Sequence, residues 1–448
     1  MTLKDSRDLD HSSSSRASLE AYDRAVELLA GYYLDPLAVI DGALAEDPDF
    51  ISGHCLRAAL GVLSWERAGE ALVKESLAAG QRLAARANER ELRHLRAAGA
   101  WLEGDFHRAV DLYGRIVLDY PRDLLALQVA HVGDFALGQQ RLLRDRVVQV
   151  VPHWSDSTPG ASFVLGMLAF GLEETNLFGM AETTARRALE RNRCDPWAVH
   201  AVAHVFEMNG RVERGVDWLE SRIDDWAPNN GFAFHNFWHL ALFKLEAGDT
   251  ESVLGLFDRY IWPKPSQVAL ELVDASALLF RLYLRGVNLG RRAASVSDAF
   301  SDPSFHGYYA FNDCHAAMAF IADGRVEQAR GLLAGLERSA GEDGSNAAMT
   351  RDVGLPLVRA LVAFGEHRYD EVVDALLPLR YVAHRFGGSN AQRDVIDQTL
   401  AEAAVRAGRV NEARALAAER RLLRPESPWA RSIEQRAFEK ALADVAAE

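Results

Sequence analysis

Two histidine pairs with the same spacing are the strongest chemical signal in the sequence. His200 and His204 stand four positions apart, and Glu207 follows three positions later. His235 and His239 repeat the pair 35 residues further along the chain. On a helix, side chains at i, i+4 and i+7 lie on one face. The sequence therefore predicts two helices that each present imidazoles along one stripe.

Imidazoles that converge from neighbouring helices are ligands for a divalent transition metal. Neutral nitrogen ligands with a carboxylate, and with coordination positions left open, suit metal-assisted or oxidative chemistry. The expected metal ligands are the paired histidines, His200, His204, His235 and His239. We expect Glu173 or Glu207 to complete the site or to act as a base. Cobalt, manganese, iron and zinc all fit this set of ligands.

Two further candidate catalytic groups come from counting residues back from the glycine at the end of each predicted helix. His315 lies nine residues before its glycine, as His239 does, and Glu173 lies six before its glycine, as His204 does. These shared levels predict that His315 and Glu173 lie near the paired histidines. Asp313 is a candidate acceptor for a ring nitrogen of a ligand histidine.

Two other interpretations of the histidines stay open. Histidines at helical spacing are often core residues whose nitrogens bond to neighbouring groups. Without a metal, the same imidazoles suit acid–base catalysis, because imidazole titrates close to neutral pH.

Aromatic and polar residues predict where a substrate would bind. Trp197 and Trp238 lie beside the paired histidines in sequence, and aromatic rings line pockets for flat heteroaromatic ligands. Gln392 and Arg393 follow a pair of glycines, and we expect them to hold a polar substrate. The segment also has a structural interpretation, in which the glycines end one helix and Ser389 caps the next.

The elements that position these residues are predicted to be helices throughout. Apolar residues recur at three- and four-residue spacing from residue 17 nearly to the end, and strand signals are almost absent. Nine glycines from Gly104 to Gly408 each follow one predicted helix and precede another, at intervals of about 38 residues, close to the period of helical-hairpin repeats. We predict an all-α, tetratricopeptide-like solenoid, a right-handed superhelix with a concave inner groove. It spans residues 17–448 as one domain, after a flexible N-terminal tail at 1–16.

Composition limits the partners. The chain has 448 residues, of which 49% are hydrophobic, and a net charge of −14. This charge disfavours nucleic acid, and no apolar stretch is long enough to cross a membrane. Three cysteines without paired spacing, Cys55, Cys194 and Cys314, argue against disulfides and iron–sulfur clusters and favour the cytoplasm. We expect a small-molecule substrate; the alternative is a scaffold that binds a partner protein or peptide in its groove.

Several motifs in order resemble the tetratricopeptide repeat protein 38 family. They lie at 166–174, 195–204, 235–239 and 387–394. The resemblance covers most of the chain from about residue 17 and implies a helical-repeat fold. A histidine usually stands in that family where this chain has Asn390, which argues against a direct catalytic role for this position. Bacterial members are similar to the tetratricopeptide component of toxoflavin-type azapteridine biosynthesis, which implies an enzyme, of oxidoreductase type, acting on a flat nitrogen heterocycle.

Overall fold

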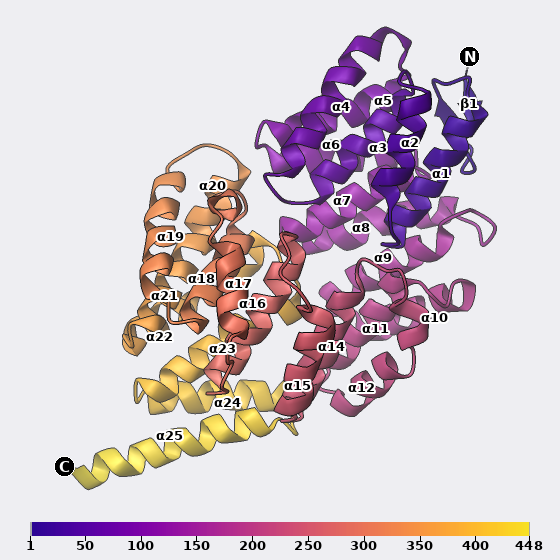
Figure 1. Ribbon diagram of the computed structural model, residues 1–448. Helices are drawn as coiled ribbons and strands as arrows, with labels where there is room; N and C mark the ends of the chain where they lie inside the picture. The colour runs from indigo at the N-terminus through magenta and orange to yellow at the C-terminus, as the bar shows by residue number, and fades with distance from the viewer. Residues whose placement is uncertain (1, 448) are drawn as a thin grey trace. The chain divides into compact units, whose positions relative to one another are not determined.

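The computed structural model describes residues 2–447, and its regular structure is almost entirely helical (Figure 1). Neighbouring helices along the chain pack in antiparallel pairs, for example α3 (Ile51–Leu63) with α4 (Gly69–Leu83) and α9 (Ala161–Glu174) with α10 (Phe178–Arg191). Each hairpin stacks on the next, as α4 does on α5 (Glu89–Leu102). The predicted all-α, tetratricopeptide-like solenoid is confirmed.

The chain divides into two compact units, whereas one domain was predicted. The first unit is Met1–Val202 with Ile223–Ala233, and the second is Ala203–Arg222 with Phe234–Glu448. The division falls within α11 (Pro196–Met208), which contributes to both.

The first unit holds two short strands and the earlier helices. They are β1 (Leu3–Lys4), β2 (Asp10–His11), α1 (Arg16–Ala30), α2 (Pro36–Glu46), α3, α4, η1 (Ala84–Arg86), α5, α6 (Phe106–Asp119), α7 (Leu124–Ala136), α8 (Gln140–Val150), η2 (Val151–His153), α9, α10 and α13 (Ile223–Trp226).

The second unit is built from the later helices. They are α12 (Val212–Glu220), α14 (Ala233–Glu246), α15 (Thr250–Leu256), η3 (Phe257–Ile261), α16 (Ala269–Leu284), α17 (Arg292–Phe300), η4 (Pro303–Phe305), α18 (Ala310–Ala322), α19 (Val326–Ser339), α20 (Ser345–Met349), η5 (Thr350–Gly354), α21 (Leu355–Gly365), α22 (Tyr369–Leu379), η6 (Ala383–Phe386), α23 (Asn390–Arg406), α24 (Val410–Leu423) and α25 (Pro428–Ala447).

Residues with positive φ, the left-handed backbone conformation, end many helices at or near the glycines that were predicted to mark the turns. Seven of the nine predicted turn glycines have positive φ. The other two, Gly179 and Gly365, lie in α10 and at the end of α21. Asn176 and His367 take the left-handed conformation there, each with φ of 62°. Asn and His tolerate this conformation better than most residues that carry a Cβ, so a search for glycine alone misplaces these two turns by a few residues.

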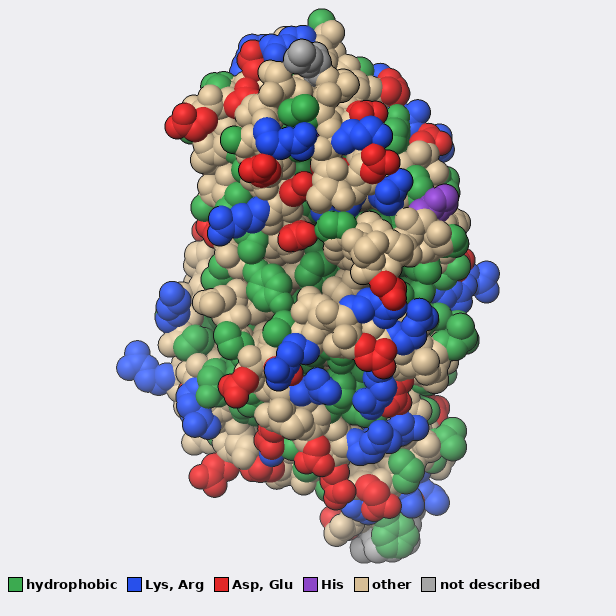
Figure 2. Space-filling model, turned by 90° about the vertical axis from the view of Figure 1, so that its right-hand side faces the viewer, with side chains coloured by type: hydrophobic (Ala, Val, Ile, Leu, Met, Phe, Trp, Pro, Cys, Tyr) green, Lys and Arg blue, Asp and Glu red, His purple; other side chains and the backbone are tan. Residues whose placement is uncertain are grey.

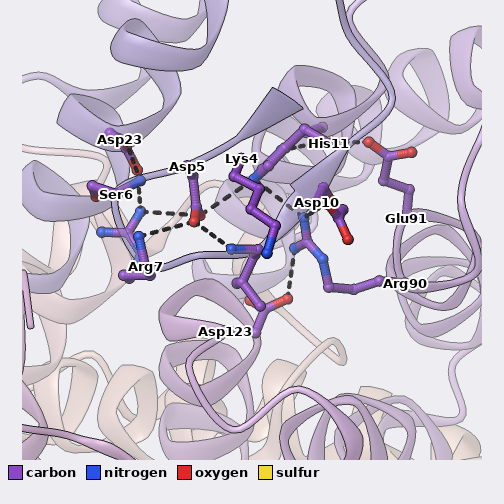
Figure 3. A network of polar contacts seen from close by, with 12 residues as sticks. Lys4, Asp5, Ser6, Arg7, Asp10, His11, Asp23, Arg90, Glu91 and Asp123 are labelled. Carbon is purple, nitrogen blue, oxygen red and sulfur yellow. Dashed lines mark hydrogen bonds and ion pairs between the residues drawn. The ribbon is translucent and has the colours of Figure 1, made fainter. Parts of the chain in front are cut away.

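The first sixteen residues are folded, so the predicted flexible tail is wrong. Strands β1 and β2 pair antiparallel, with Leu3 opposite His11. Arg7 and His11 are 1% and 0% exposed. Arg7 donates to Asp23 of α1 over 2.6 Å (Figure 3), and Nδ1 of His11 lies 2.7 Å from Oγ of Ser52 in α3. The polar composition of this segment indicated disorder. Its polar side chains instead bond to residues far away in the sequence, and these bonds hold the segment in place.

Surface charges of both signs are mixed. Figure 2 shows acidic and basic side chains interspersed with apolar ones over the face in view, with very little histidine. Most of the candidate histidines are instead buried, as the next section describes. Within the described residues, no helix is long and apolar enough to span a membrane.

Candidate metal centre

Three helices position the histidine cluster. His204 is on α11, His235 and His239 are on α14, and their carboxylate partners come from α11 and α16. Helix α11 begins at Pro196, a residue suited to the first helical position because its missing N–H would have no intrahelical partner there. Apolar residues surround the histidines on α14, where Phe237 and Leu240 are 5% and 2% exposed. A helix that is apolar on all sides is buried, and it carries its histidines into the interior.

The predicted convergence of the paired histidines is present. His204, His235 and His239 offer ring nitrogens that all lie within 4.8 Å of one another. The ring centroids of His204 and His239 are 4.5 Å apart, and those of His235 and His239 are 4.8 Å apart. Exposed fractions are 0% for His204 and His239 and 4% for His235. His200 lies one turn before His204 on the same face of α11, with its ring 5.2 Å from that of Phe170.

Two buried carboxylates orient two of the rings. Nδ1 of His235 lies 2.6 Å from Oδ2 of Asp274, and Nδ1 of His239 lies 2.9 Å from Oε2 of Glu207. When each carboxylate is ionised it accepts the hydrogen bond, so that Nδ1 carries the proton and Nε2 carries the lone pair. This arrangement of carboxylate, histidine and metal is typical of metal centres, where it fixes the tautomer and raises the basicity of the ligand nitrogen.

Both carboxylates are held where a negative charge is costly. Burial raises the pKa of Glu207 to about 7, against the opposite effects of Arg424 and His204. Burial also raises the pKa of Asp274, against the opposite effects of His235 and Arg281. A divalent cation bound to the imidazoles would supply positive charge close to both groups and favour their ionised forms. The electrostatics of the cluster therefore suit a cation.

Asp274 is the functional residue that the sequence analysis missed. It lies 0% exposed in an apolar stretch of α16, 39 residues from its partner His235. An aspartate inside an otherwise apolar helix was an available signal, because buried charges need partners. The sequence does not show that Asp274 pairs with His235, because the two residues lie on different helices that meet only in the folded protein.

Glu207 and Asp313 each have a partner in the structure. Oε2 of Glu207 lies 2.9 Å from Nδ1 of His239, and its expected role as a metal ligand or a base stays a prediction. Oδ1 of Asp313 accepts from the backbone N–H of Gly307 over 2.8 Å, and its expected bond to a ligand histidine also stays a prediction. A carboxylate behind a ligand orients it, whereas a carboxylate beside the metal would bind it.

His315 and Glu173 are buried in different helices. Nδ1 of His315 donates to the carbonyl of Phe311 over 2.8 Å, and burial lowers the pKa of His315 to about 4. His315 is therefore neutral at pH 7, and it is not in the histidine group defined above. Glu173 is 0% exposed on α9 in the first unit. Its catalytic role stays a prediction.

The predicted substrate-binding residues have partners within the protein. Trp238 is 0% exposed and lies between the ring of His235, stacked at 5.3 Å, and the guanidinium of Arg281, at 5.4 Å. It therefore supports a histidine ring and offers no face to a substrate. Trp197 is 5% exposed, and its indole N–H donates to the carbonyl of Ala30 over 3.2 Å.

Gln392 and Arg393 belong to the start of α23. Oε1 of Gln392 accepts from the N–H of Ser389, and Oγ of Ser389 accepts from the N–H of Gln392, a capping box. Arg393 donates to the carbonyl of Gly388 and to the side chain of Asn390. The structural interpretation of this segment fits these bonds, and the expected contact of Gln392 with substrate does not.

The fold and the site together define a class of protein: an all-α, tetratricopeptide-like repeat protein with a buried cluster of imidazoles oriented by carboxylates. No family model matches the chain. Among solved structures, a human IFIT1 dimer with m7Gppp-AAAA is 14% identical over 96% of each chain, with a TM-score of 0.42. The P58(IPK) TPR domain is 14% identical over 72% of this chain and 99% of its own, with a TM-score of 0.20. At these scores, no conclusion about ligand or activity follows from either likeness.

Proposed function

We propose that this chain is a metal-dependent enzyme of small-molecule metabolism that binds one divalent transition metal ion through His204, His235 and His239. The observation that carries the proposal is the pair of bonds from Nδ1 of His235 to Asp274 and from Nδ1 of His239 to Glu207. Two rings each turn Nδ1 toward a carboxylate, which leaves Nε2 as the nitrogen that would bind a cation, as in the carboxylate–histidine pairs of metal centres.

The spacing of the nitrogens suits a metal after a small contraction. Ligand nitrogens of a tetrahedral zinc site lie about 3.3 Å apart, given bonds of about 2.05 Å. The nitrogens of the three histidines lie within 4.8 Å of one another. Side-chain rotations of this size are small for histidines on two helices, so an ion can draw the rings together. Cobalt, manganese, iron and zinc all accept such a site.

Three protein ligands leave coordination positions for a substrate or dioxygen. This is how catalytic metal sites differ from structural ones, which are closed by four protein ligands. The proposed reaction is of oxidoreductase type, and the proposed substrate is the flat nitrogen heterocycle suggested by the family resemblance. His200, one turn before His204, is the further nitrogen that could fill the site.

The test is a double variant with a matched control. His204→Ala/His239→Ala removes two of the three ligands, and His153→Ala removes an exposed histidine of η2. With cobalt(II) as the probe, we expect wild type and His153→Ala to show the same visible absorption bands and the double variant to show none. A double variant that binds cobalt as tightly as the control would remove the proposal.

A second candidate function uses the same groups without a metal. Burial raises the pKa of Glu207 to about 7, near the operating range of a general acid or base. This alternative predicts that turnover persists after chelation, whereas the metal enzyme loses turnover and regains it when the metal returns.

A further inference from the structure

A small cavity in the second unit is lined by an unusual number of guanidinium groups. Four arginines line it, two within helices α16 and α24 and two at the C-caps of the same helices: Arg281, Arg420, Arg285 and Arg424. Its volume is about 20 Å³, and a water molecule needs roughly 10–15 Å³ measured in this way. The cavity therefore holds one molecule or ion of about the size of water and excludes phosphate or sulfate.

The carboxylates around the cavity do not neutralise the arginines. Asp394 accepts from Arg420 over 2.9 Å and from Arg424 over 3.3 Å. Glu246 accepts from Arg420 over 2.9 Å and lies 3.8 Å from Arg285. The third carboxylate lining the cavity, Glu207, is hydrogen-bonded to a histidine. Four guanidinium groups thus face three carboxylates, which leaves an excess of positive charge.

The arginine that lacks a carboxylate partner is the most buried. Arg281 is 1% exposed, and its Nη atoms donate to the backbone carbonyls of Ala277, Ala391 and Gln392. Asp394 and Glu207 act on this guanidinium from beyond ion-pair distance, and burial outweighs them and lowers the pKa of Arg281 to about 10. Burial also lowers the pKa of Arg285 to about 10, as expected for a cation short of negative partners.

Three buried donors in the cavity wall lack acceptors within the described residues. They are the Nε–H groups of Arg281, Arg285 and Arg420. Guanidinium groups only donate hydrogen bonds, so an occupant that satisfies several of them must accept several bonds at once. Oε1 of Glu246 and Oε1 of Gln398 in the same wall also lack hydrogen-bond donors within the described residues. A halide ion accepts several bonds at once and supplies negative charge to the guanidinium groups, whereas a water molecule would also donate to these two oxygens; a dependence of the Tm on chloride distinguishes the two occupants.

We propose that this cavity is a binding site for one small monovalent anion of chloride size. The ion would lie among α14, α16, α23 and α24, which supply most of the lining residues. It would tie the C-terminal helices to α14 and α16 by neutralising the guanidinium groups that they share. The proposed donors are not metal ligands, although Glu207 lines the cavity and also bonds to His239.

The first test measures thermal unfolding of the full chain in sodium chloride and in sodium gluconate at equal ionic strength. A ligand that binds only the folded state raises stability with the logarithm of its concentration once it exceeds the Kd. We expect the Tm to rise with chloride and not with gluconate. An equal response to both salts would overturn the proposal.

Variants locate the effect. Arg285→Gln removes one donor and one charge from the cavity and should weaken the chloride response at least about tenfold in concentration. The matched control is Arg146→Gln, which removes a largely buried arginine, bonded to Asp134 over 2.8 Å, in the first unit. It should lower the Tm and keep the chloride response; a control that loses the response equally would contradict the assignment.

A structural measurement on wild-type protein decides the matter if Arg285→Gln does not fold. Crystals grown in sodium bromide should show an anomalous peak within hydrogen-bond reach of Nε of Arg281, Arg285 or Arg420. Bromide peaks elsewhere on the molecule with none in the cavity would overturn the proposal.

Discussion

Two regions of this protein bury histidines beside carboxylates, and they use them differently. In the first unit, His94 and Arg90 share one oxygen of Asp123, each at 2.8 Å, within the network that holds the N-terminal strands (Figure 3). In the second unit, His235 and His239 each have a carboxylate of their own, and their rings meet edge to face with centroids 4.8 Å apart. In the first arrangement an arginine, Arg90, lies beside the imidazole of His94. In the second arrangement another imidazole takes that place, since His235 lies beside His239.

The difference separates a histidine paired with a permanent cation from the histidines that we propose to bind a metal ion. Arg90 is a permanent cation, so Asp123 already has a counter-charge, and the histidine beside it bonds to the same carboxylate. Around His239 the neighbouring imidazole rings are those of His204 and His235, at 4.5 and 4.8 Å between centroids. A histidine cluster without a guanidinium group among its rings keeps room for an external cation.

The largest expected effect is on the first region. Asp123→Asn should lower the free energy of unfolding by about 3–5 kcal/mol, because it leaves the buried Arg90 without its counter-charge. The control is Asp119→Asn, an exposed partner of Arg93, which should cost less than about 0.5 kcal/mol. Urea unfolding of both variants measures the difference. Equal costs would show that the network is not structural.

The dependence of folding stability on pH distinguishes the two regions, because the change has the opposite sign in each. Although burial opposes it, His94 and Arg90 hold the pKa of Asp123 well below its usual range. Its contribution is therefore complete above the unfolded pKa of 3.8 and is lost as the pH falls below that value.

The carboxylate in the histidine cluster behaves in the opposite way. The pKa of Glu207 rises from 4.5 to about 7 on folding, so the metal-free folded state holds a proton between these values that the unfolded state has lost. Stability should fall as the pH rises from 4.5 to 7, by at most about 3 kcal/mol. Glu207→Gln should lack this fall, as measured by urea unfolding at several pH values. The same slope in wild type and variant would contradict the burial argument.

The smallest effect tests the role of Asp274. Asp274→Asn keeps a hydrogen-bond acceptor for Nδ1 of His235 and removes the charge. We expect metal binding about 10- to 100-fold weaker, the usual result of changing a residue that orients a ligand. Isothermal titration with cobalt(II) measures it, with Asp313→Asn as the control, because Asp313 bonds to the backbone of Gly307. A larger loss in the control would reverse the two assignments.

The fold was predictable because its signals are local. Helical periodicity and turn residues such as Gly210 and Gly248, both with positive φ, are properties of short segments. The meeting of His204 with His235 and His239 was also predictable, because a repeat places equivalent positions of neighbouring hairpins side by side.

The rest of the site depends on contacts between distant segments. The partner of His235 is Asp274, and its pairing follows from how α14 and α16 pack. The N-terminal strands show the same limit, because Arg7 and His11 look like part of a polar tail until Asp23 and Ser52 are placed beside them. Local composition cannot reveal such partners.

The most direct test of the central claim is elemental analysis of wild-type protein purified without an affinity tag, before and after chelation. Binding at the three histidines predicts about one equivalent of a transition metal per chain, removed by the chelator and restored by cobalt(II) or zinc(II). A chain that stays free of metal after incubation with cobalt, manganese, iron and zinc would contradict the account, and the cluster formed by His204, His235 and His239 would then be a buried acid–base or structural group.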